Sequence, residues 1–283
     1  MAAPSGTLAI LAGGGALPLV VAREAAAAGR SVHILAIEGS FGDLAAAPCA
    51  ATPVGLGQVG GILDTLKRHG CTEMVICGYV ERPDISQLKL DFGALTHLPR
   101  LASMMIGGDN HLLTTIVRFF EAKGFRVVGA DEVAPSLLAG TGPLGRSRPS
   151  TDASADIARG FEIVRALGAF DIGQAAVVSD GYTLAVEAAE GTDWLLERVA
   201  ELRRRKGRLG GKPKGVLVKR AKPGQDRRVD LPTIGPRTVE LAAAANLVGI
   251  GVQARGVLIV ERERIVGLAD AAGMFVTGAA DGD

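Results

Sequence analysis

Residues 6–29 read GTLAILAGGGALPLVVAREAAAAG: a short apolar run, a glycine-rich turn and an alanine-rich stretch that ends at Gly29. The apolar run predicts a buried strand. The stretch after the turn predicts a helix, because alanine and leucine favour helices and glycine commonly follows a helix end. A strand that leads into a helix through a tight turn is the first part of a βαβ unit, so we expect a parallel sheet covered by helices.

The same alternation of strand and helix signals continues to about residue 130. Three further apolar runs predict strands, at residues 31–37, 73–80 and 125–130. Three longer stretches predict helices, at residues 57–70, 91–107 and 109–124. Strands that alternate with helices favour parallel pairing, with each helix as a crossover. The order therefore predicts an α/β N-terminal domain over residues 1–132, with a Rossmann-like parallel sheet.

Residues 133–150 interrupt this pattern, because they are rich in glycine, proline and serine and show no hydrophobic period. We expect a linker there that acts as a hinge. Residues 151–283 are predicted to form a mixed α+β C-terminal domain, since Asp180-Gly181 joins two β-rich runs and is a strong hairpin signal. The runs at residues 247–254 and 256–270 are expected to supply the last strands.

The composition is that of a soluble globular protein, since 48% of the 283 residues are hydrophobic and 22% are charged. No run approaches the roughly 18 apolar residues of a membrane span, and the N-terminus lacks the basic start of a signal peptide. We therefore expect a cytoplasmic protein. Cys49, Cys71 and Cys77 form no C-x-x-C pair, which predicts free buried thiols in a reducing compartment.

Positive charge is concentrated in one part of the chain. The net charge is +1, yet residues 198–228 contain 13 basic and two acidic residues. A solvated helix face is the ordinary explanation for such a run. The alternative is an anionic partner, which could be phosphate, nucleic acid or an acidic membrane surface.

The glycine-rich turn at residues 12–18 lies where dinucleotide-binding folds hold a pyrophosphate. Pro18 occupies the sixth position of G-x-G-x-x-G, so that fingerprint is broken, although Glu38 follows the second strand where a ribose-binding acid would lie. Two explanations stay open. The glycines allow a tight turn, or the N–H groups of Gly14 and Gly15 bind a nucleotide or phosphate.

Two other positions belong to the ends of expected strands. Gly78 and Tyr79 follow a strand at its carboxyl end, where open α/β sheets bind ligands. Gln174 comes just before an apolar strand, where a polar side chain needs a buried partner or a ligand.

Three polar residues lie at the starts of expected helices. Asp109 and Thr192 can cap the free N–H groups of a first turn, and Asp193 complements the helix dipole. Capping explains all three, and a ligand role is the alternative.

The stretch VKRAKPGQDRRVDLPTIGPRTVE, residues 218–240, is too irregular for a helix and too rich in proline for a central strand. Loops of fixed shape with few hydrophobic residues often carry chemistry. Asp226 lies among Lys222, Arg227 and Arg228, so its carboxylate should stay ionised. Such a carboxylate can hold Mg²⁺ together with substrate phosphate oxygens, and a surface cluster of salt bridges is the alternative.

Several kinds of site are excluded. The four histidines have no zinc-binding spacing, and neither a G-x-S-x-G elbow nor a Walker A motif occurs. Two rival functions remain: a nucleotide-dependent oxidoreductase that uses the glycine turn, and a non-enzymatic module that binds anionic lipid or nucleic acid. The broken fingerprint argues against the first, and an aromatic content of 4% argues against stacking on single-stranded nucleic acid.

Six motifs together resemble one family along nearly the whole chain: GGGALP, CGYV, GDNHLL, DIGQAAVV, AVEAAEGTD and the stretch that ends at residue 240. The family is the UDP-2,3-diacylglucosamine pyrophosphatases of lipid A biosynthesis, in the form unrelated to calcineurin-like hydrolases. The resemblance implies hydrolysis to UMP and 2,3-diacylglucosamine 1-phosphate (lipid X), with attack on the α phosphorus and Mg²⁺ or another divalent metal. It also implies a lipid bound between two domains, and a cytoplasmic homodimer on the anionic inner-membrane surface.

Through the QD of the last motif, the resemblance assigns the essential acid to Asp226, which makes the C-terminal domain the expected catalytic domain. The residue patterns described above supply the rest of the expected site. The expected catalytic residues are Gln225, Lys219 and Asp226, of which Asp226 either ligates the metal or orients the attacking water. Electrostatic neutralisation of the pyrophosphate would come from Lys219 and from three further cations, Lys222, Arg227 and Arg228. The other substrate-binding residues that we expect are Gly14, Gly15, Gly78, Tyr79, Asp109, Gln174, Thr192, Asp193 and Thr233.

Overall fold

The computed structural model describes residues 6–80, 91, 109–205 and 212–280, so the helix expected at residues 91–107 lies outside the described residues. The chain divides into two compact units. The N-terminal unit comprises the chain up to Ser136 together with Asp226–Asp230, and the C-terminal unit comprises Leu137–Gln225 and Leu231–Asp283. A five-residue segment of the second half is thus part of the first unit.

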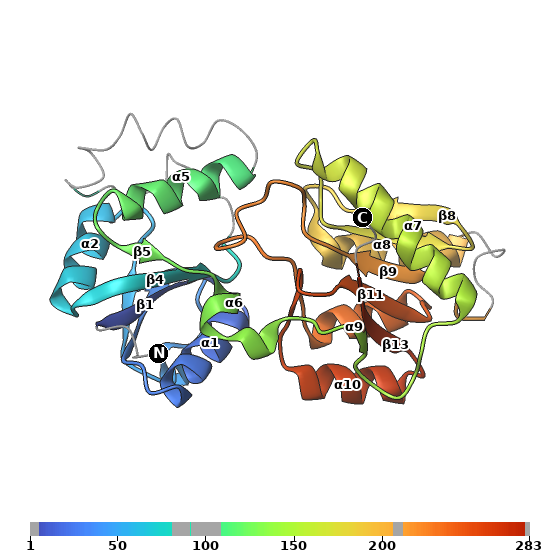
Figure 1. Ribbon diagram of the computed structural model, residues 1–283, viewed down its shortest axis with the longest axis horizontal. Helices are drawn as coiled ribbons and strands as arrows, with labels where there is room; N and C mark the ends of the chain where they lie inside the picture. The colour runs from blue at the N-terminus through green and yellow to red at the C-terminus, as the bar shows by residue number, and fades with distance from the viewer. Residues whose placement is uncertain (1–5, 81–90, 92–108, 206–211, 281–283) are drawn as a thin grey trace. The chain divides into compact units, whose positions relative to one another are not determined.

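The N-terminal unit contains a five-stranded sheet in which every neighbouring pair of strands is parallel (Figure 1). The strand order is β3-β2-β1-β4-β5. The strands are β1 (Thr7–Ala12), β2 (Val32–Ile37), β3 (Ala51–Val54), β4 (Cys71–Cys77) and β5 (Arg126–Val127). This order confirms the Rossmann-like prediction. The sequence analysis missed β3, a short edge strand that contains Pro53, which only an edge position tolerates well.

Helices cover both faces of this sheet. They are α1 (Leu17–Ala27), α2 (Val59–Arg68), α5 (Asp109–Glu121) and α6 (Ala130–Val133). Successive side chains of a strand point to opposite faces of the sheet. Leu11 and Leu35 point to one face, where they pack in a core cluster with α2 and α5. Figure 1 shows α1 on the opposite face, where Ile10 and Ile34 are also fully buried.

The C-terminal unit contains a mixed six-stranded sheet in the order β6-β13-β11-β9-β7-β8. The strands are β6 (Gly142–Pro143), β7 (Ala175–Ser179), β8 (Tyr182–Val186), β9 (Val216–Lys219), β11 (Gly249–Gln253) and β13 (Phe275–Ala279), with β10 (Thr233–Ile234) and β12 (Leu258–Ile259) as a separate parallel pair. β9, β11 and β13 are parallel, whereas β6 and β7 pair antiparallel with their neighbours. The β7–β8 hairpin turns at Asp180–Gly181, as the sequence predicted.

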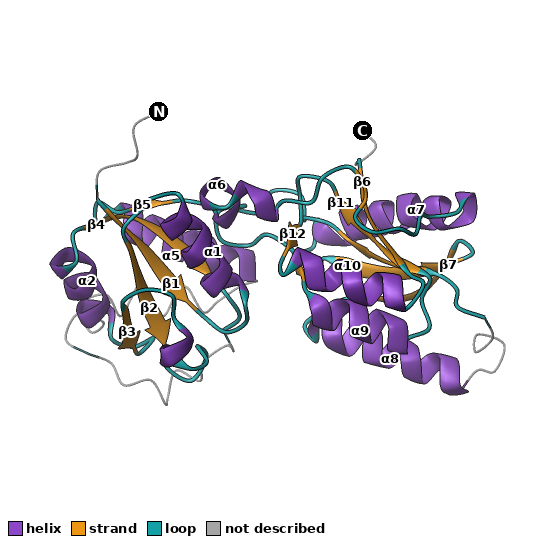
Figure 2. Cartoon of the chain, turned by 90° about the horizontal axis from the view of Figure 1, so that it is seen from below, coloured by secondary structure: helices purple, strands orange, loops and turns teal. Residues whose placement is uncertain are grey.

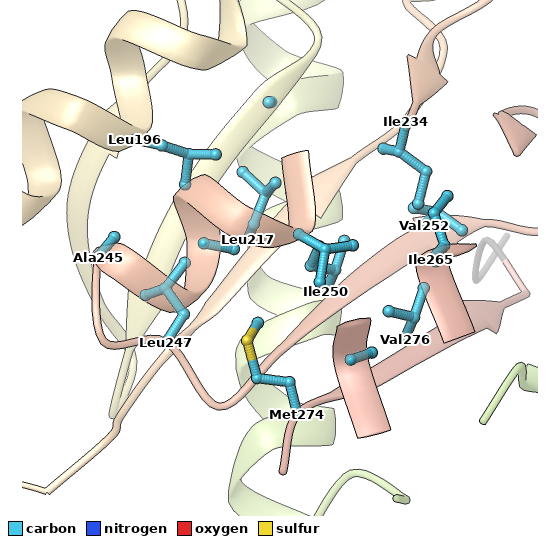
Figure 3. Close-up of a cluster of buried hydrophobic side chains, with 14 of the residues drawn as sticks. Leu196, Leu217, Ile234, Ala245, Leu247, Ile250, Val252, Ile265, Met274 and Val276 are labelled. Atoms are coloured by element: carbon cyan, nitrogen blue, oxygen red, sulfur yellow. The ribbon is translucent and has the colours of Figure 1, made fainter. Parts of the chain in front are cut away.

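Four helices complete the described part of this unit. Figure 2 shows α7 (Thr151–Gly168) on one face of the sheet, and α8 (Gly191–Arg205), α9 (Pro236–Ala244) and α10 (Arg262–Ala271) on the other. Ile157 and Phe161 of α7 pack on Val216 and Val218 of β9. Leu217 lies between Val216 and Val218 in the sequence and points to the other face of the sheet. There it belongs to the larger core cluster, which Figure 3 shows with Leu196 and Ile250.

The strand prediction for residues 256–270 is wrong over most of its length. Only Leu258 and Ile259 form a strand, and helix α10 begins at Arg262. Glu261 has φ +55°, a left-handed conformation that ends the extended run and starts the helix. The apolar run at residues 257–260 concealed the helical spacing of Ile265 and Ala269, which are the buried residues of α10.

Residues 137–150, most of the expected linker, belong to the C-terminal unit, where β6 pairs with β13. Whether residues 133–150 act as a hinge stays a prediction. The three cysteines are unpaired; Cys71 and Cys77 are buried as expected, whereas Cys49 is only partly buried. Burial raises the pKa of Cys77 to about 12. Across the described residues, every helix is too short or too polar to cross a bilayer.

Candidate active site

The turns that follow β1 and β4 lie against each other through their backbones. The N–H of Gly14 donates to the carbonyl oxygen of Tyr79 at 2.7 Å, and the N–H of Tyr79 donates back to Gly14 at 2.9 Å. Gly78 has φ +94°, and a Cβ there would lie 2.8 Å from the carbonyl carbon of Gly13. A side chain at Gly78 would thus be both strained and crowded. Close backbone packing therefore accounts for Gly14 and Gly78.

Gly15 and Tyr79 are exposed at this edge of the N-terminal sheet. Gly15 has φ +87°, and a Cβ there would meet no atom of the described residues within 4 Å. The Tyr79 side chain is 69% exposed, although it is large and mostly apolar. Because the Gly14 N–H donates to Tyr79, the prediction of a backbone contact to phosphate now concerns Gly15.

Asp226 is held by Arg228. The backbone N–H and Nε of Arg228 donate to Asp226 Oδ1 at 3.1 and 2.9 Å, and Nη2 donates to Oδ2 at 2.7 Å. These hydrogen bonds, together with the positive charge, lower the pKa of Asp226 despite its partial burial. The sequence analysis expected an ionised carboxylate here, and the structure gives its cause.

The segment Asp226–Asp230 is attached to the N-terminal unit at three points. Arg228 Nη1 donates to Glu121 Oε1 at 2.7 Å, at the last residue of α5. Val229 packs against the core cluster that contains α2 and α5. Arg227 Nη2 lies 3.9 Å from Asp131 Oδ2. These contacts explain why five residues of the second half belong to the first unit.

Lys219 is the centre of a second polar cluster, in the C-terminal unit. It is the last residue of β9 and only 8% exposed. Its Nζ donates to Thr192 Oγ1 at 2.7 Å and to the carbonyl oxygen of Thr233 at 3.1 Å. The Thr192 hydroxyl donates in turn to Glu187 Oε2 at 3.0 Å. A nearly buried ammonium group is thus held by neutral oxygens, with a carboxylate behind them.

Lys222 and Gln225, which follow Lys219 in the sequence, make a separate set of contacts. Lys222 Nζ donates to Asp171 Oδ1 at 2.5 Å, and its backbone N–H donates to Gln225 Oε1 at 2.8 Å. Gln225 is 8% exposed, and its Nε2 has no hydrogen-bond partner among the described residues. A buried amide donor without a partner is costly, so this group could serve a ligand.

The remaining predicted positions are more ordinary. The Asp193 carboxylate accepts from Arg237 Nε at 3.1 Å on an exposed surface. The carbonyl oxygen of Gln174 accepts the backbone N–H of Arg220 at 3.0 Å, next to β7. The capping prediction for Asp109 and Thr192 is wrong, because Asp109 is the first residue of α5 and Thr192 is the second residue of α8, and neither precedes its helix as an N-cap does.

A metal cage made by the protein alone does not fit the described residues. Among them, no group of three or more His, Cys, Asp or Glu side chains could hold an ion. Mg²⁺ is commonly bound through one or two carboxylates and completed by substrate phosphates. Asp226, ionised and beside cations, fits that smaller role.

Comparisons with known proteins cover almost the whole chain. Residues 7–137 match the family model described as the LpxI N-terminal domain, and residues 140–277 match the LpxI C-terminal domain. A curated relative from Caulobacter vibrioides, UDP-2,3-diacylglucosamine pyrophosphatase LpxI, is 41% identical over 271 residues, which are 96% of this chain and 96% of the relative. The chain belongs to the LpxI family.

In this LpxI family member, the predicted site residues fall into two groups. The N-terminal unit contains Gly14, Gly15, Gly78, Tyr79, Asp109, Asp226, Arg227 and Arg228. The C-terminal unit contains Gln174, Thr192, Asp193, Lys219, Lys222, Gln225 and Thr233. Within the units, the structure brings Asp226 together with Arg228, and Lys219 together with Thr192 and Thr233.

The sequence analysis missed the acidic partners of these groups. Glu121 contacts Arg228 and Glu187 contacts Thr192, but neither acid was predicted as a site residue. Glu121 is 107 residues from Arg228 in sequence, so only the fold reveals their pairing. Glu187 is five residues before Thr192, in the resembling motif AVEAAEGTD, where its proximity could have been noticed.

Proposed function

We propose that this LpxI family member hydrolyses the pyrophosphate of UDP-2,3-diacylglucosamine to UMP and 2,3-diacylglucosamine 1-phosphate, a step of lipid A synthesis. The observation that carries the proposal is the 41% identity to the curated pyrophosphatase over 96% of both chains. Each unit also contains charged groups of the kind that such a reaction needs: Asp226 in the N-terminal unit and Lys219 in the C-terminal unit. In the reaction, the oxygen of water bonds to phosphorus, the bridging P–O bond breaks, and its electron pair leaves with the departing phosphate.

Lys219 is suited to stabilise charge on the phosphate oxygens. Its ammonium group is nearly buried, and low exposure to water strengthens its interaction with an anion. The contacts with Thr192 and Thr233 hold the group in place before substrate arrives. Arg227 is a second candidate for phosphate contact, because its side chain is half exposed and its Nη2 lies as far as 3.9 Å from Asp131 Oδ2.

Asp226 is better suited to orient water or to ligate a metal ion than to accept a proton. Its pKa is lowered by Arg228, and a carboxylate with a low pKa is a weak base at neutral pH. A divalent ion such as Mg²⁺, when bound, would neutralise phosphate charge there. The chain's own contribution is to keep the carboxylate ionised and fixed in direction.

The test is incubation of the purified chain with UDP-2,3-diacylglucosamine, with and without EDTA, followed by mass spectrometry. We expect UMP and the lipid 1-phosphate as products. EDTA should suppress the formation of both, and added Mg²⁺ should restore it. Hydrolysis in ¹⁸O-water should label UMP, because attack on the α phosphorus is proposed. An intact substrate after long incubation with Mg²⁺ would refute the activity, and label in the lipid phosphate would move the attack to the β phosphorus.

Peripheral binding to an anionic membrane and a homodimeric state are further proposals. The basic residues at 198–228 contribute less free positive charge for membrane binding than the sequence indicates. Arg203 is 4% exposed and donates to the carbonyl oxygen of Lys214, and both Arg204 and Arg205 pair with Glu201. Sedimentation with anionic vesicles and light scattering test the two proposals, and a monomer that stays in the supernatant would count against both.

A further inference from the structure

The Asp226 carboxylate is one end of a short chain of charges in the N-terminal unit. Arg228 connects it to Glu121, with Nε and Nη2 on Asp226 and Nη1 on Glu121. The guanidinium group is planar and rigid, so two carboxylates bound along its edges fix its orientation. The exposed fraction of the side chains falls from 40% at Glu121, through 36% at Arg228, to 15% at Asp226.

Arg228 was expected to bind substrate phosphate, but its surroundings favour a different role. All three of its guanidinium nitrogens donate to carboxylates. A phosphate at this position would have to displace one of those carboxylates and would be repelled by the other. The guanidinium is therefore better placed to hold Asp226 than to hold an anionic ligand.

The backbone of the segment restrains Asp226 from the other side. The N–H groups of Val229 and Asp230 donate to the Asp226 carbonyl oxygen, both at 3.1 Å, which forms a tight turn. The Val229 side chain packs on the core cluster that includes α5. The turn fixes the backbone of Asp226, and the direction of its carboxylate then depends on Arg228.

We propose that Glu121 is a positioning residue for Asp226: by holding Arg228 against the end of α5, it fixes the direction of the Asp226 carboxylate. The inference rests on the proposed function, since it assigns Asp226 to the reaction. Glu121 itself touches Arg228 and does not need to touch substrate. Exposed ion pairs contribute little to stability, so its loss should affect turnover more than folding.

The experiment compares Glu121→Gln with the wild-type chain and with Glu162→Gln. Glu162→Gln is the matched control, because it removes an exposed ion pair to Arg159 on α7, which belongs to the C-terminal unit, whereas Asp226–Asp230 belongs to the N-terminal unit. We expect Glu121→Gln to lower kcat by about 5-fold, with KM changed less than about twofold and an unchanged melting temperature. In an Arg228→Gln background, Glu121→Gln should have no further effect on kcat, because the connection is already lost.

Hydrogen–deuterium exchange of the peptide that covers Asp226–Asp230 gives a readout that needs no substrate. We expect faster exchange in Glu121→Gln and no change in Glu162→Gln. Unchanged exchange, or a loss of kcat that is equally large in the Arg228→Gln background, would overturn the positioning role. A wild-type chain without turnover would instead refute the proposed function, and exchange alone would then decide whether Glu121 restrains the segment.

Discussion

The two units each present polar groups at the carboxyl ends of parallel strands, but the two edges differ in what forms them. In the N-terminal unit, backbones approach closely: a Cβ at Gly78 would lie 2.8 Å from the carbonyl carbon of Gly13, and a Cβ at Gly14 would lie 2.7 Å from the carbonyl oxygen of Ser40. In the C-terminal unit, the end of β9 carries Lys219, whose ammonium group is surrounded by side-chain and backbone oxygens. Substitutions should therefore act through backbone strain at the first edge and through charge at the second.

The largest effect is expected at Asp226, which belongs to neither edge and lies on the segment between Gln225 and Leu231. Asp226→Ala should lower kcat by about 10²-fold or more, because one well-placed carboxylate is lost. Its melting temperature should stay near the wild-type value, since the turn keeps its backbone bonds. Steady-state kinetics at saturating Mg²⁺ and calorimetry measure both. Near-normal turnover, or a collapse in melting temperature, would show that the carboxylate is structural.

Lys219→Met tests the charge-based edge. Removal of one preorganised electrostatic group typically costs about 10²-fold in turnover, and methionine keeps much of the volume of the buried stem. Lys214→Met is the control, because it removes an exposed lysine that pairs with Asp180. Turnover of Lys219→Met equal to that of Lys214→Met would mean that the buried ammonium group has no role in the reaction.

Gly78→Ala tests the backbone-based edge. A positive φ costs roughly 1 kcal/mol for alanine, and the contact with the backbone of Gly13 adds to this cost. Gly124→Ala is a close match, with φ +91° against +94° and no atom within 4 Å of its added Cβ. Denaturant unfolding should show a larger loss of stability for Gly78→Ala. Equal losses would remove the argument from close backbone approach.

A smaller, pH-dependent effect is expected in the N-terminal unit, whose sequence contains all four histidines of the chain. Burial, and then the nearby His69, lower the pKa of His33, whose ring stacks on that of His69 at 3.7 Å. The unfolded chain therefore binds the proton more readily than the folded one. Stability should fall as pH decreases below about 6.5, the ordinary histidine value, towards the lowered folded value.

Melting temperatures between pH 7.5 and 5 measure this dependence, and His33→Gln should make it weaker. His111→Gln is the control, because that side chain is exposed on α5. A slope that His33→Gln leaves unchanged would assign the pH dependence to other groups.

The sequence predicted most of the architecture because its local signals agree with the fold. Residues 6–29 form β1, a glycine turn and α1, and Asp180-Gly181 forms the hairpin turn. The prediction failed where local and tertiary signals compete. The apolar run at residues 257–260 looked like part of a long strand, although helix α10 begins at Arg262.

At the site, the sequence predicts the residues whose charged neighbours are close in the sequence. It does not predict residues that meet their charged partners only in the folded structure. The ionised state of Asp226 followed from adjacent arginines. Glu121 is ordinary in its own helix and becomes informative only when Arg228 lies 2.7 Å away. Likewise, Gln225 Nε2, which has no hydrogen-bond partner in the part of the chain that the structure describes, is informative only because it is buried, and the sequence does not reveal burial.

The segment Asp226–Asp230 also has a consequence for recombination between relatives. The matches to the two family domains meet between residues 137 and 140, which looks like a natural point for exchanging halves. A chimera joined there would bring a foreign Asp226–Asp230 segment to the native α5 and core. Hybrids should therefore be active chiefly when the donor half supplies partners for Glu121 and for the surface that Val229 covers. Because Asp226–Asp230 must fit the N-terminal unit, changes in these five residues and in their N-terminal partners should be inherited together.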